Sequence, residues 1–148
     1  MSLETFVKVK RLHPEAKLPT KATTGSVCHD VYASESRMVG SGAVVPVPTG
    51  LAFEVPDGCM LEIRPRSGLS SEGLAIANSP GTLDSDYRGE LMILMLRAVS
   101  PSDSMWLIDV GDRIAQIKLV RVPEIEFLEV DELSETVRGE GGFGSTGR

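Results

Sequence analysis

Two aspartates stand two residues apart in the segment Gly81-Thr-Leu-Asp-Ser-Asp-Tyr-Arg-Gly89, which follows Asn78-Ser-Pro80. In extended backbone, side chains two residues apart point to the same face, so the carboxylates of Asp84 and Asp86 lie together. Paired carboxylates supply a general base for catalysis or ligands for Mg²⁺. A water-exposed acidic turn has the same composition, so this segment alone leaves both interpretations open.

The segment Pro65-Arg-Ser-Gly-Leu69 predicts a place for an anion. It opens the one plausible helical stretch of the chain, residues 67–72, and brings Arg66 and Ser67 beside free helix N–H groups. An ordinary helix N-cap explains the serine equally well.

A glutamine interrupts a partly apolar row in Gly111-Asp-Arg-Ile-Ala-Gln116-Ile-Lys-Leu. Strand alternation puts Ile114, Gln116 and Lys118 on one face and leaves Ala115, Ile117 and Leu119 for the other. The amide of this glutamine needs a partner, either a structural hydrogen bond or a phosphate.

The last eleven residues, Arg138-Gly-Glu-Gly-Gly-Phe-Gly-Ser-Thr-Gly-Arg148, combine five glycines with groups that suit a nucleotide. Phe143 offers a flat face to a base, Ser145 and Thr146 offer hydroxyls, and the two arginines offer guanidinium groups. A frayed terminus has a similar composition. A P-loop is excluded, because arginine stands in the lysine position and no helix follows. The interpretation that remains is a mobile lid over residues 138–148, closing over a phosphorylated ligand, on a domain formed by residues 1–137.

Cys28-His29-Asp30 resembles a thiol triad in composition only. In extended chain the cysteine and the aspartate point one way and the histidine the other, so no nucleophile–base hydrogen bond forms. Two cysteines and two histidines without metal-ligand spacing also argue against zinc. We interpret Cys28 and His29 as packing or surface residues.

Composition indicates one domain, with 148 residues, 41% hydrophobic residues and a net charge of −6. The acidic balance argues against tracking along nucleic acid, although a few arginines gathered in one site still bind a single nucleotide. The longest apolar run, residues 91–96, is too short to cross a membrane, and no signal-peptide pattern opens the sequence. We therefore expect a cytoplasmic protein, with both cysteines reduced.

Short β-branched and aliphatic runs recur between Gly, Pro, Ser and Asp, which predicts an all-β, jelly-roll-like fold. Residues 90–97 have apolar side chains on both faces and are expected to form a central strand covered twice. The predicted strands are residues 6–11, 29–33, 43–46, 50–55, 60–64, 74–78, 89–98, 104–108, 113–121 and 125–130.

Taken together, these segments resemble the five ordered motifs of the homotrimeric dUTP pyrophosphatases, the dUTPases. The match runs from Gly25-Ser…Asp30-Val-Tyr32 through the three internal segments above to the glycine-rich tail. The chain departs from the family in the first motif, where Cys28-His29 replaces the usual Gly-Tyr.

The resemblance implies a jelly-roll-like distorted barrel with a flexible glycine-rich tail, assembled as a homotrimer in which all three subunits build each active site. It also implies Mg²⁺-dependent hydrolysis of dUTP to dUMP and pyrophosphate, which keeps uracil out of DNA and supplies dUMP for thymidylate synthesis. The expected partners are then dUTP and the other two copies, with no nucleic acid and no membrane.

Carried over by resemblance, Asp84 activates a water that attacks the α-phosphorus, and Tyr87 packs on the deoxyribose and excludes a 2′-hydroxyl. The Asn78 amide and the hairpin backbone that includes Thr82 and Leu83 face the uracil edge. Mg²⁺ is held by triphosphate oxygens and waters, with Asp30 as a water-mediated support. The other implied contacts are Met92 in the pocket, Arg66, Ser67, Gly68 and Gln116 on the phosphates, Phe143 over the uracil, and Arg138, Gly144, Ser145 and Thr146 closing on the phosphates.

Two rival functions fit parts of this pattern. A dCTP deaminase has a related fold, but its members generally use a glutamate base and lack the Asp84-x-Asp86-Tyr87 pattern and the tail. A non-catalytic nucleotide sensor would not need Asp84, Gln116 and Phe143 all to be intact.

Overall fold

The computed structural model describes residues 5–100 and 104–143 of the chain. Short strands dominate these residues, as the spacing of the β-branched runs predicts, so the all-β fold class is confirmed. The elements are β1 (Lys8–Arg11), β2 (His29–Tyr32), β3 (Arg37–Val39), β4 (Val44–Glu54), β5 (Cys59–Arg64), α1 (Ser67–Ser71), β6 (Leu74–Ile76), β7 (Gly81–Leu83), β8 (Glu90–Arg97), β9 (Trp106–Ile108) and β10 (Arg113–Arg121).

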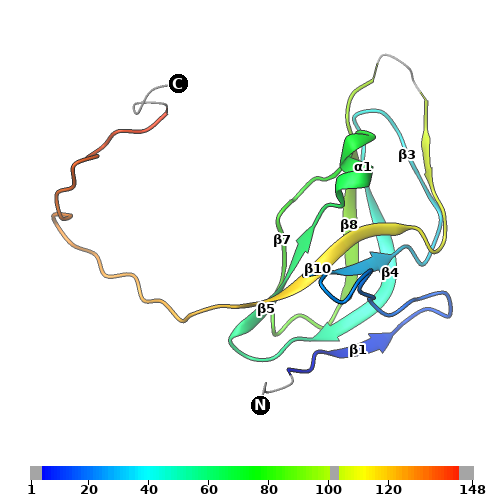
Figure 1. Ribbon diagram of the computed structural model, residues 1–148, viewed down its shortest axis with the longest axis horizontal. Helices are drawn as coiled ribbons and strands as arrows, with labels where there is room; N and C mark the ends of the chain where they lie inside the picture. Colours follow the sequence, from blue (N-terminus) through cyan, green and yellow to red (C-terminus); the bar gives the residue numbers. More distant parts are fainter. Residues whose placement is uncertain (1–4, 101–103, 144–148) are drawn as a thin grey trace.

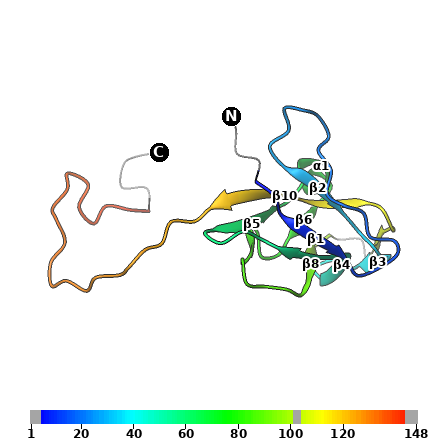
Figure 2. The same cartoon turned by 90° about the horizontal axis from the view of Figure 1, so that it is seen from below.

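Two four-stranded antiparallel sheets form the body of the molecule. One has the order β1-β4-β8-β6 and the other the order β2-β10-β5-β7, while β3 and β9 pair as a separate ribbon (Figures 1 and 2). Neither sheet closes on itself among the described residues, so the jelly-roll-like body is an open sandwich rather than a closed barrel.

The core lies between the two sheets, and it draws on alternate residues of β8 and on a continuous buried run in β4. Leu51 and Ile93 come from one sheet and Val31, Ile63 and Ile117 from the other, and each is at most 5% exposed. Burying an aliphatic side chain of this size contributes about 1.5–3 kcal/mol, so this layer fixes how the two sheets face each other.

Strand β8 lies inside its sheet, between β4 and β6, as its composition predicts. Only one of its faces is covered by the described part of the chain, however. Leu91, Ile93 and Met95 are buried, whereas Met92 is 38% exposed and Leu94 is half-buried. The expectation of two covered faces is wrong for the single chain, because no described residue packs fully over the second face.

The alternation predicted for β10 shifts near its start. Ile114 is buried, not on the face of Gln116, because the ladder with β2 changes register between Arg113 and Ala115. From Ala115 onward the alternation holds, with Ile117 buried and Lys118 half-buried. The shift is what brings Arg113 back toward the polar face that holds the candidate site.

The predicted strands 43–46 and 50–55 are one long strand, β4. Its ladder with β8 is interrupted between Pro48 and Ala52, and Gly50 adopts a φ of +67° inside the interruption. A Cβ at Gly50 would also meet the Cβ of Ala16 at 2.8 Å, so glycine is required both for conformation and for space. The three-residue strands β3 and β7 were not predicted, because runs this short carry no clear period.

The chain leaves the body at the end of β10. Val122 N donates to Gly58 O at 2.8 Å, and every residue from 123 to 140 is exposed as the chain runs away from the sandwich (Figures 1 and 2). The strand predicted over 125–130 is wrong for the single chain, since no described residue pairs with it. The projection therefore begins near residue 122, well before the proposed lid at 138–148.

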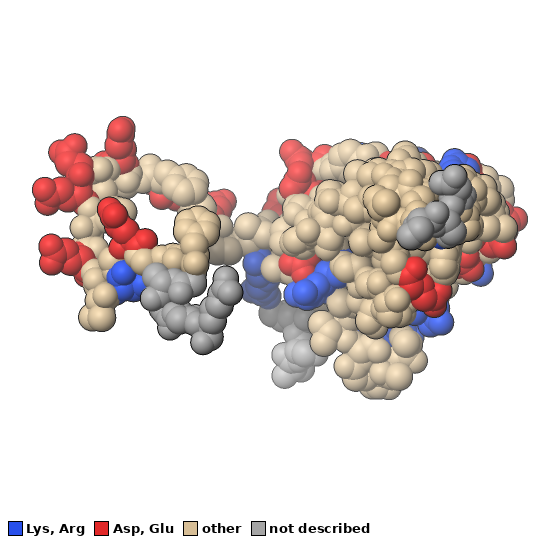
Figure 3. All heavy atoms as spheres, turned by 90° about the horizontal axis from the view of Figure 1, so that it is seen from above, with Lys and Arg blue, Asp and Glu red and all other residues tan. Residues whose placement is uncertain are grey.

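This projecting segment is both acidic and apolar. Residues 122–148 carry seven carboxylates and two arginines, a net charge of −5 out of −6 for the whole chain. The acidic side chains stand along it in Figure 3. Phe127 is 93% exposed and Leu133 is 87% exposed. These apolar side chains therefore contribute nothing to the core of their own chain.

Candidate active site

A cavity of about 280 Å³ lies beside the turn that follows β7. Asn78, Thr82 and Asp84 line it on the side of the hairpin, and Tyr87 and Met92 line it on the side of β8. Leu83 also belongs to the lining, although its side chain is 4% exposed. The volume is just below the range of about 300–1,000 Å³ usual for ligand pockets, which suits a nucleoside better than a whole nucleotide.

Asp84 is the acidic group of this cavity. It directly follows β7, its side chain is exposed, and its carbonyl accepts a hydrogen bond from Tyr87 N at 3.2 Å in a tight turn. Asp86 lies in the same turn but does not line the cavity. Of the two carboxylates that the sequence offers, the structure brings only Asp84 to the pocket wall.

Tyr87 lines the same cavity as Asn78. Its hydroxyl donates to the carbonyl of Glu90 at 3.2 Å, and 46% of the residue is exposed. The carboxylate of Glu90 in turn accepts from Gly50 N at 2.7 Å, which links the start of β8 to β4. The ring therefore rests on a segment that is itself anchored to the core.

A second, polar cavity of about 490 Å³ opens beside the start of α1. Ser67 and Gln116, both predicted to contact phosphates, line it together with Cys28 and Arg64. Gln116 Nε2 donates to Pro65 O at 2.8 Å, so its amide has the structural partner that the sequence left open. Gly68 is exposed, and nothing lies within 4 Å of where its Cβ would stand.

Register places the charged groups of this region on one face of the sheet. Strand β10 runs between β2 and β5, and Gln116 stands opposite Asp30 on one side and Arg64 on the other. Residues that face each other across antiparallel strands point to the same side, so these three side chains share a face.

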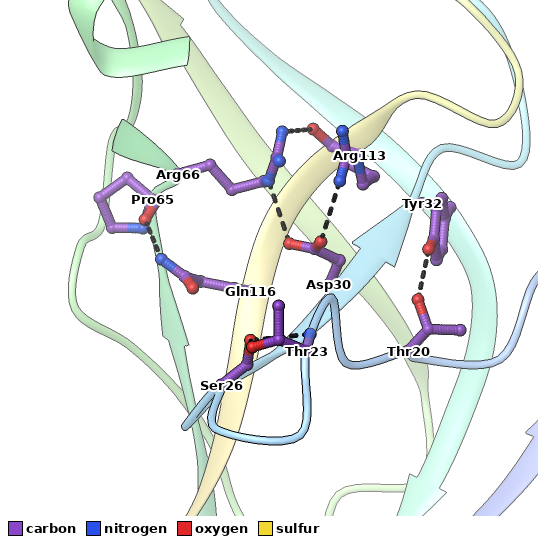
Figure 4. A network of polar contacts seen from close by, with 9 residues as sticks. All are labelled: Thr20, Thr23, Ser26, Asp30, Tyr32, Pro65, Arg66, Arg113 and Gln116. Carbon is purple, nitrogen blue, oxygen red and sulfur yellow. Dashed lines mark hydrogen bonds and ion pairs between the residues drawn. The ribbon is translucent and has the colours of Figure 1, made fainter. Parts of the chain in front are cut away.

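Asp30 is the centre of an arginine network, drawn in Figure 4. Arg66 Nε donates to Asp30 Oδ1 at 3.0 Å, and Arg113 Nη1 lies 3.6 Å from Asp30 Oδ2. Arg66 Nη1 also donates to the carbonyl oxygen of Arg113 at 3.3 Å. One carboxylate, 12% exposed, thus balances two guanidinium groups and leaves a net positive charge at the start of α1.

The two cavities lie on opposite sides of β5. Ile63 points inward and lines the Asp84 cavity, whereas its neighbours Glu62 and Arg64 point the other way and line the Gln116 cavity. The turn between β6 and β7 separates them in the same manner, with Asn78 on one side and Pro80 on the other. No described residue lines both cavities, so the Asp84 cavity and the Gln116 cavity are separate in the single chain.

The described tail residues lie far from both cavities. Arg138 Nε donates to Gly141 O at 2.7 Å within the tail itself, and Phe143 is fully exposed with a φ of 52°. Gly144, Ser145 and Thr146 lie outside the described residues. The structure therefore brings none of the described tail groups to the site of its own chain.

Within the described residues, no group of three or more His, Cys, Asp or Glu side chains is placed to hold a metal ion. No described helix has the length and apolar character of a membrane span. Cys28 and His29 are both half-buried, and Cys28 lines the polar cavity rather than packing in the core.

Sequence reasoning missed several residues of the two cavities and the arginine network. Ile63 and Arg64 enter the two cavities only through the pairing of β5 with β7 and β10. Arg113 joins the site through the register shift of β10. Its position in Gly111-Asp-Arg113 beside Gln116 was a signal that could have identified it, since two arginines near one phosphate site are common.

Comparison with known proteins agrees with this geometry. The sequence model of the dUTPase family matches residues 14–147. The deoxyuridine 5'-triphosphate nucleotidohydrolase of Nautilia profundicola is 42% identical over 143 residues, covering 96% of this chain and 99% of that protein. The same-named protein of Fusobacterium nucleatum is 44% identical over 146 residues, covering 96% and 98%.

Solved structures give the same result. The dUTPase of Staphylococcus bacteriophage 80alpha, solved with dUpNHpp, has a TM-score of 0.86 at 25% identity, covering 98% of this chain and 100% of that one. A mutant dUTPase from phage phi11 of S. aureus, described with a structural Mg(II) ion, shares the fold with a TM-score of 0.78 at 22% identity, covering 86% and 98%. The chain belongs to the dUTPase family.

Proposed function

We propose that this protein hydrolyses dUTP to dUMP and pyrophosphate. The observation that carries the proposal is the placement of Asp84 in a nucleoside-sized cavity together with Asn78 and Tyr87. Relatives named deoxyuridine 5'-triphosphate nucleotidohydrolase, at 42% identity over nearly the whole chain, support it. The cellular result would be removal of dUTP, which keeps uracil out of DNA, and a supply of dUMP for thymidylate synthesis.

The hairpin is the proposed base reader. Asn78 offers an amide, which both donates and accepts, and the backbone beside Thr82 and Leu83 offers the remaining groups. A wall built from backbone leaves little room for a 5-methyl group, so thymine is rejected by size and cytosine by its reversed donor and acceptor pattern. Met92, 38% exposed on the far wall, packs against the nucleoside.

The proposed reaction is an in-line displacement at the α-phosphorus. Asp84 accepts a proton from a water, the water oxygen forms a bond to the α-phosphorus, and the bond from that phosphorus to the bridging oxygen breaks. Pyrophosphate leaves with the electron pair, and dUMP stays on the hairpin. Arg66, Ser67, Gly68 and Gln116 hold the phosphates and offset the developing negative charge.

Mg²⁺ fits this site as an ion that arrives with the nucleotide. Among the described residues, no three His, Cys, Asp or Glu side chains gather into a metal-binding group. Mg²⁺ does not need such a group, because it is commonly bound by one or two carboxylates together with substrate phosphates and waters. When bound, it neutralises triphosphate charge. We propose triphosphate oxygens and waters as its ligands, with Asp30 supporting it only through water, because that carboxylate already pairs with Arg66 and Arg113.

We propose that the working unit is a homotrimer with shared sites. The two cavities of one chain lie on opposite sides of β5, which supports an arrangement in which the Asp84 cavity of one copy meets the phosphate-binding face of another. The projecting segment supports the same arrangement, since it reaches away from its own body with apolar side chains exposed. Its last part, residues 138–148, closes as a mobile lid on a neighbouring site, with Phe143 over the uracil and Arg138, Gly144, Ser145 and Thr146 on the phosphates.

The direct test is product analysis with dUTP and dCTP as separate substrates, with and without Mg²⁺. We expect dUMP and pyrophosphate from dUTP, and no product from dCTP. Formation of dUTP or dUMP from dCTP would identify a deaminase instead. Tight binding of dUTP without pyrophosphate release would identify a sensor protein. Sedimentation of the same samples measures the oligomeric state.

Replacing Tyr87 by alanine is expected to narrow the preference for dUTP over UTP. Tyr87 lines the cavity, and in the proposed binding mode its ring excludes the 2′-hydroxyl of a ribonucleotide; discrimination by one small group is worth about 10–200-fold. The ratio of kcat/KM values for the two nucleotides measures the effect. A ratio that stays at the wild-type value would place sugar discrimination elsewhere.

Replacing Asp30 by asparagine is expected to raise KM for dUTP more than it lowers kcat. The change removes the ion pair that orients Arg66. Loss of a hydrogen bond to a charged group of this kind costs about 1.5–3 kcal/mol. Asp84 keeps its position, so proton transfer is affected less. Glutamate at position 30 should recover part of the affinity, and a large fall in kcat with unchanged KM would contradict the proposed role.

A further inference from the structure

Tyr87 folds back over the chain that follows it, and the hydroxyl end of its ring lies against Gly89. A Cβ added at Gly89 would stand 2.5 Å from Tyr87 Cζ and 3.0 Å from Cε2, and it would also collide with the hydroxyl oxygen. Contacts this short do not occur between real Cβ atoms and their neighbours, so a side chain at position 89 would displace the ring. The hydroxyl end of the Tyr87 ring occupies its place because residue 89 has no side chain.

The backbone does not require glycine at this position. Gly89 is absent from the described glycines with positive φ, which are those at positions 42, 50, 58, 73, 111 and 139. Alanine could therefore adopt the same backbone conformation without strain. The three atoms nearest to the added Cβ all belong to the side chain of Tyr87, so the cost of a substitution falls on that ring.

The same end of the ring is held by Glu90. The Tyr87 hydroxyl donates to the Glu90 carbonyl at 3.2 Å, and the Glu90 carboxylate accepts from Gly50 N at 2.7 Å. Because Gly50 has no space for a side chain beside Ala16, the acceptor at Glu90 is fixed to a tightly packed part of β4. The hydroxyl end of the ring thus lies both against Gly89 and within hydrogen-bonding distance of the Glu90 carbonyl.

We propose that Gly89 is a positioning residue for sugar selection, acting through Tyr87, which rests on the dUTP hydrolysis proposed above. The hydroxyl end of the ring packs against Gly89, and Tyr87 lines the cavity. A side chain at position 89 pushes the ring away from this position and breaks the hydrogen bond to Glu90. The wall against the sugar then has no fixed position, although Asp84 and the hairpin are untouched.

The expected result for Gly89→Ala is a fall of about tenfold or more in the preference for dUTP over UTP, toward the value of Tyr87→Ala. The double variant Gly89→Ala/Tyr87→Ala should match Tyr87→Ala alone, because the collision partner is gone. An added Cβ at Gly40 meets the flexible Met105 side chain at 3.4 Å, away from the cavity lining, so Gly40→Ala is the matched control and keeps the wild-type ratio.

A readout independent of activity comes from the two tyrosines of the chain. With ¹³C-labelled tyrosine, Gly89→Ala should shift the ring signal that Tyr87→Phe removes and leave the signal of Tyr32 in place. If Gly89→Ala lowers the thermal midpoint, the double variant should restore it. A double variant that remains as unstable as Gly89→Ala would overturn the proposal.

The outcomes separate the two proposals. If the unaltered chain does not hydrolyse dUTP, the proposed function is wrong and the selectivity role falls with it. If it does, but Gly89→Ala keeps the wild-type ratio, or its effect adds in full to that of Tyr87→Ala, the role of Gly89 alone is overturned.

Discussion

Replacing Asp84 by asparagine is expected to lower kcat by about 10²–10⁴-fold, the usual contribution of a general base. Asparagine keeps the shape of the side chain and its hydrogen bonds but does not accept a proton at neutral pH. Asp84 is exposed at the cavity wall and lies outside the buried core, so the thermal midpoint should stay close to that of the unaltered chain. Steady-state kinetics and binding of a non-hydrolysable dUTP analogue measure the two effects separately.

The matched control is Asp86→Asn, which makes the same chemical change two residues away. Asp86 does not line the cavity, so its replacement should cost far less in kcat. Near-normal turnover in Asp84→Asn, or an equal loss in the two variants, would remove Asp84 from the role of base.

Deleting residues 139–148 is expected to lower kcat/KM steeply while the ligand-free protein keeps its thermal midpoint. The deletion removes Phe143 and the phosphate-facing donors, and the described part of that segment contributes nothing to the core of its own chain. Loss of aromatic stacking alone costs about 1–3 kcal/mol, equivalent to about 5–150-fold, and loss of water exclusion adds to it. A deleted chain with unchanged kcat/KM would contradict the lid.

Mixing experiments test whether the lid serves another chain. Truncated chains with an intact Asp84 are combined with full-length Asp84→Asn chains, each inactive or nearly so alone. Some mixed trimers then place an intact tail over an intact base, so activity should return. Phe143→Trp should report closure by fluorescence when the analogue binds, against the half-buried Trp106 as background. Mixed trimers that form without regaining activity would show that each lid serves its own base.

Local chemistry explains which site residues the sequence could predict. Asn78, Asp84 and Tyr87 lie within ten residues of one another, and their segment carries its turn and its carboxylate together. The hairpin supplies one side of the cavity that they line, and β8 and Ile63 supply much of the rest. Ser67 was predictable for the same local reason, because its place at the start of α1 follows from the helix-opening residues before it.

Strand pairing explains what the sequence could not predict. Ile63 lines the Asp84 cavity because β5 pairs with β7. Arg113 reaches Asp30 because the ladder of β10 with β2 shifts in register. Residues 125–130 have the composition of a strand, but a strand forms only against a partner, and the described residues of this chain provide none. The open face of β8 at Met92 has the same cause.

The division of the two cavities by β5 has a genetic consequence. In the proposed assembly a chain lends its aspartate to one nucleotide and its arginine network to a different one. An allele altered at both places would damage two catalytic centres for every defective chain incorporated. Such an allele would act dominantly in a cell that also carries a normal copy, whereas a chain that failed to fold would be lost from the assembly and remain recessive.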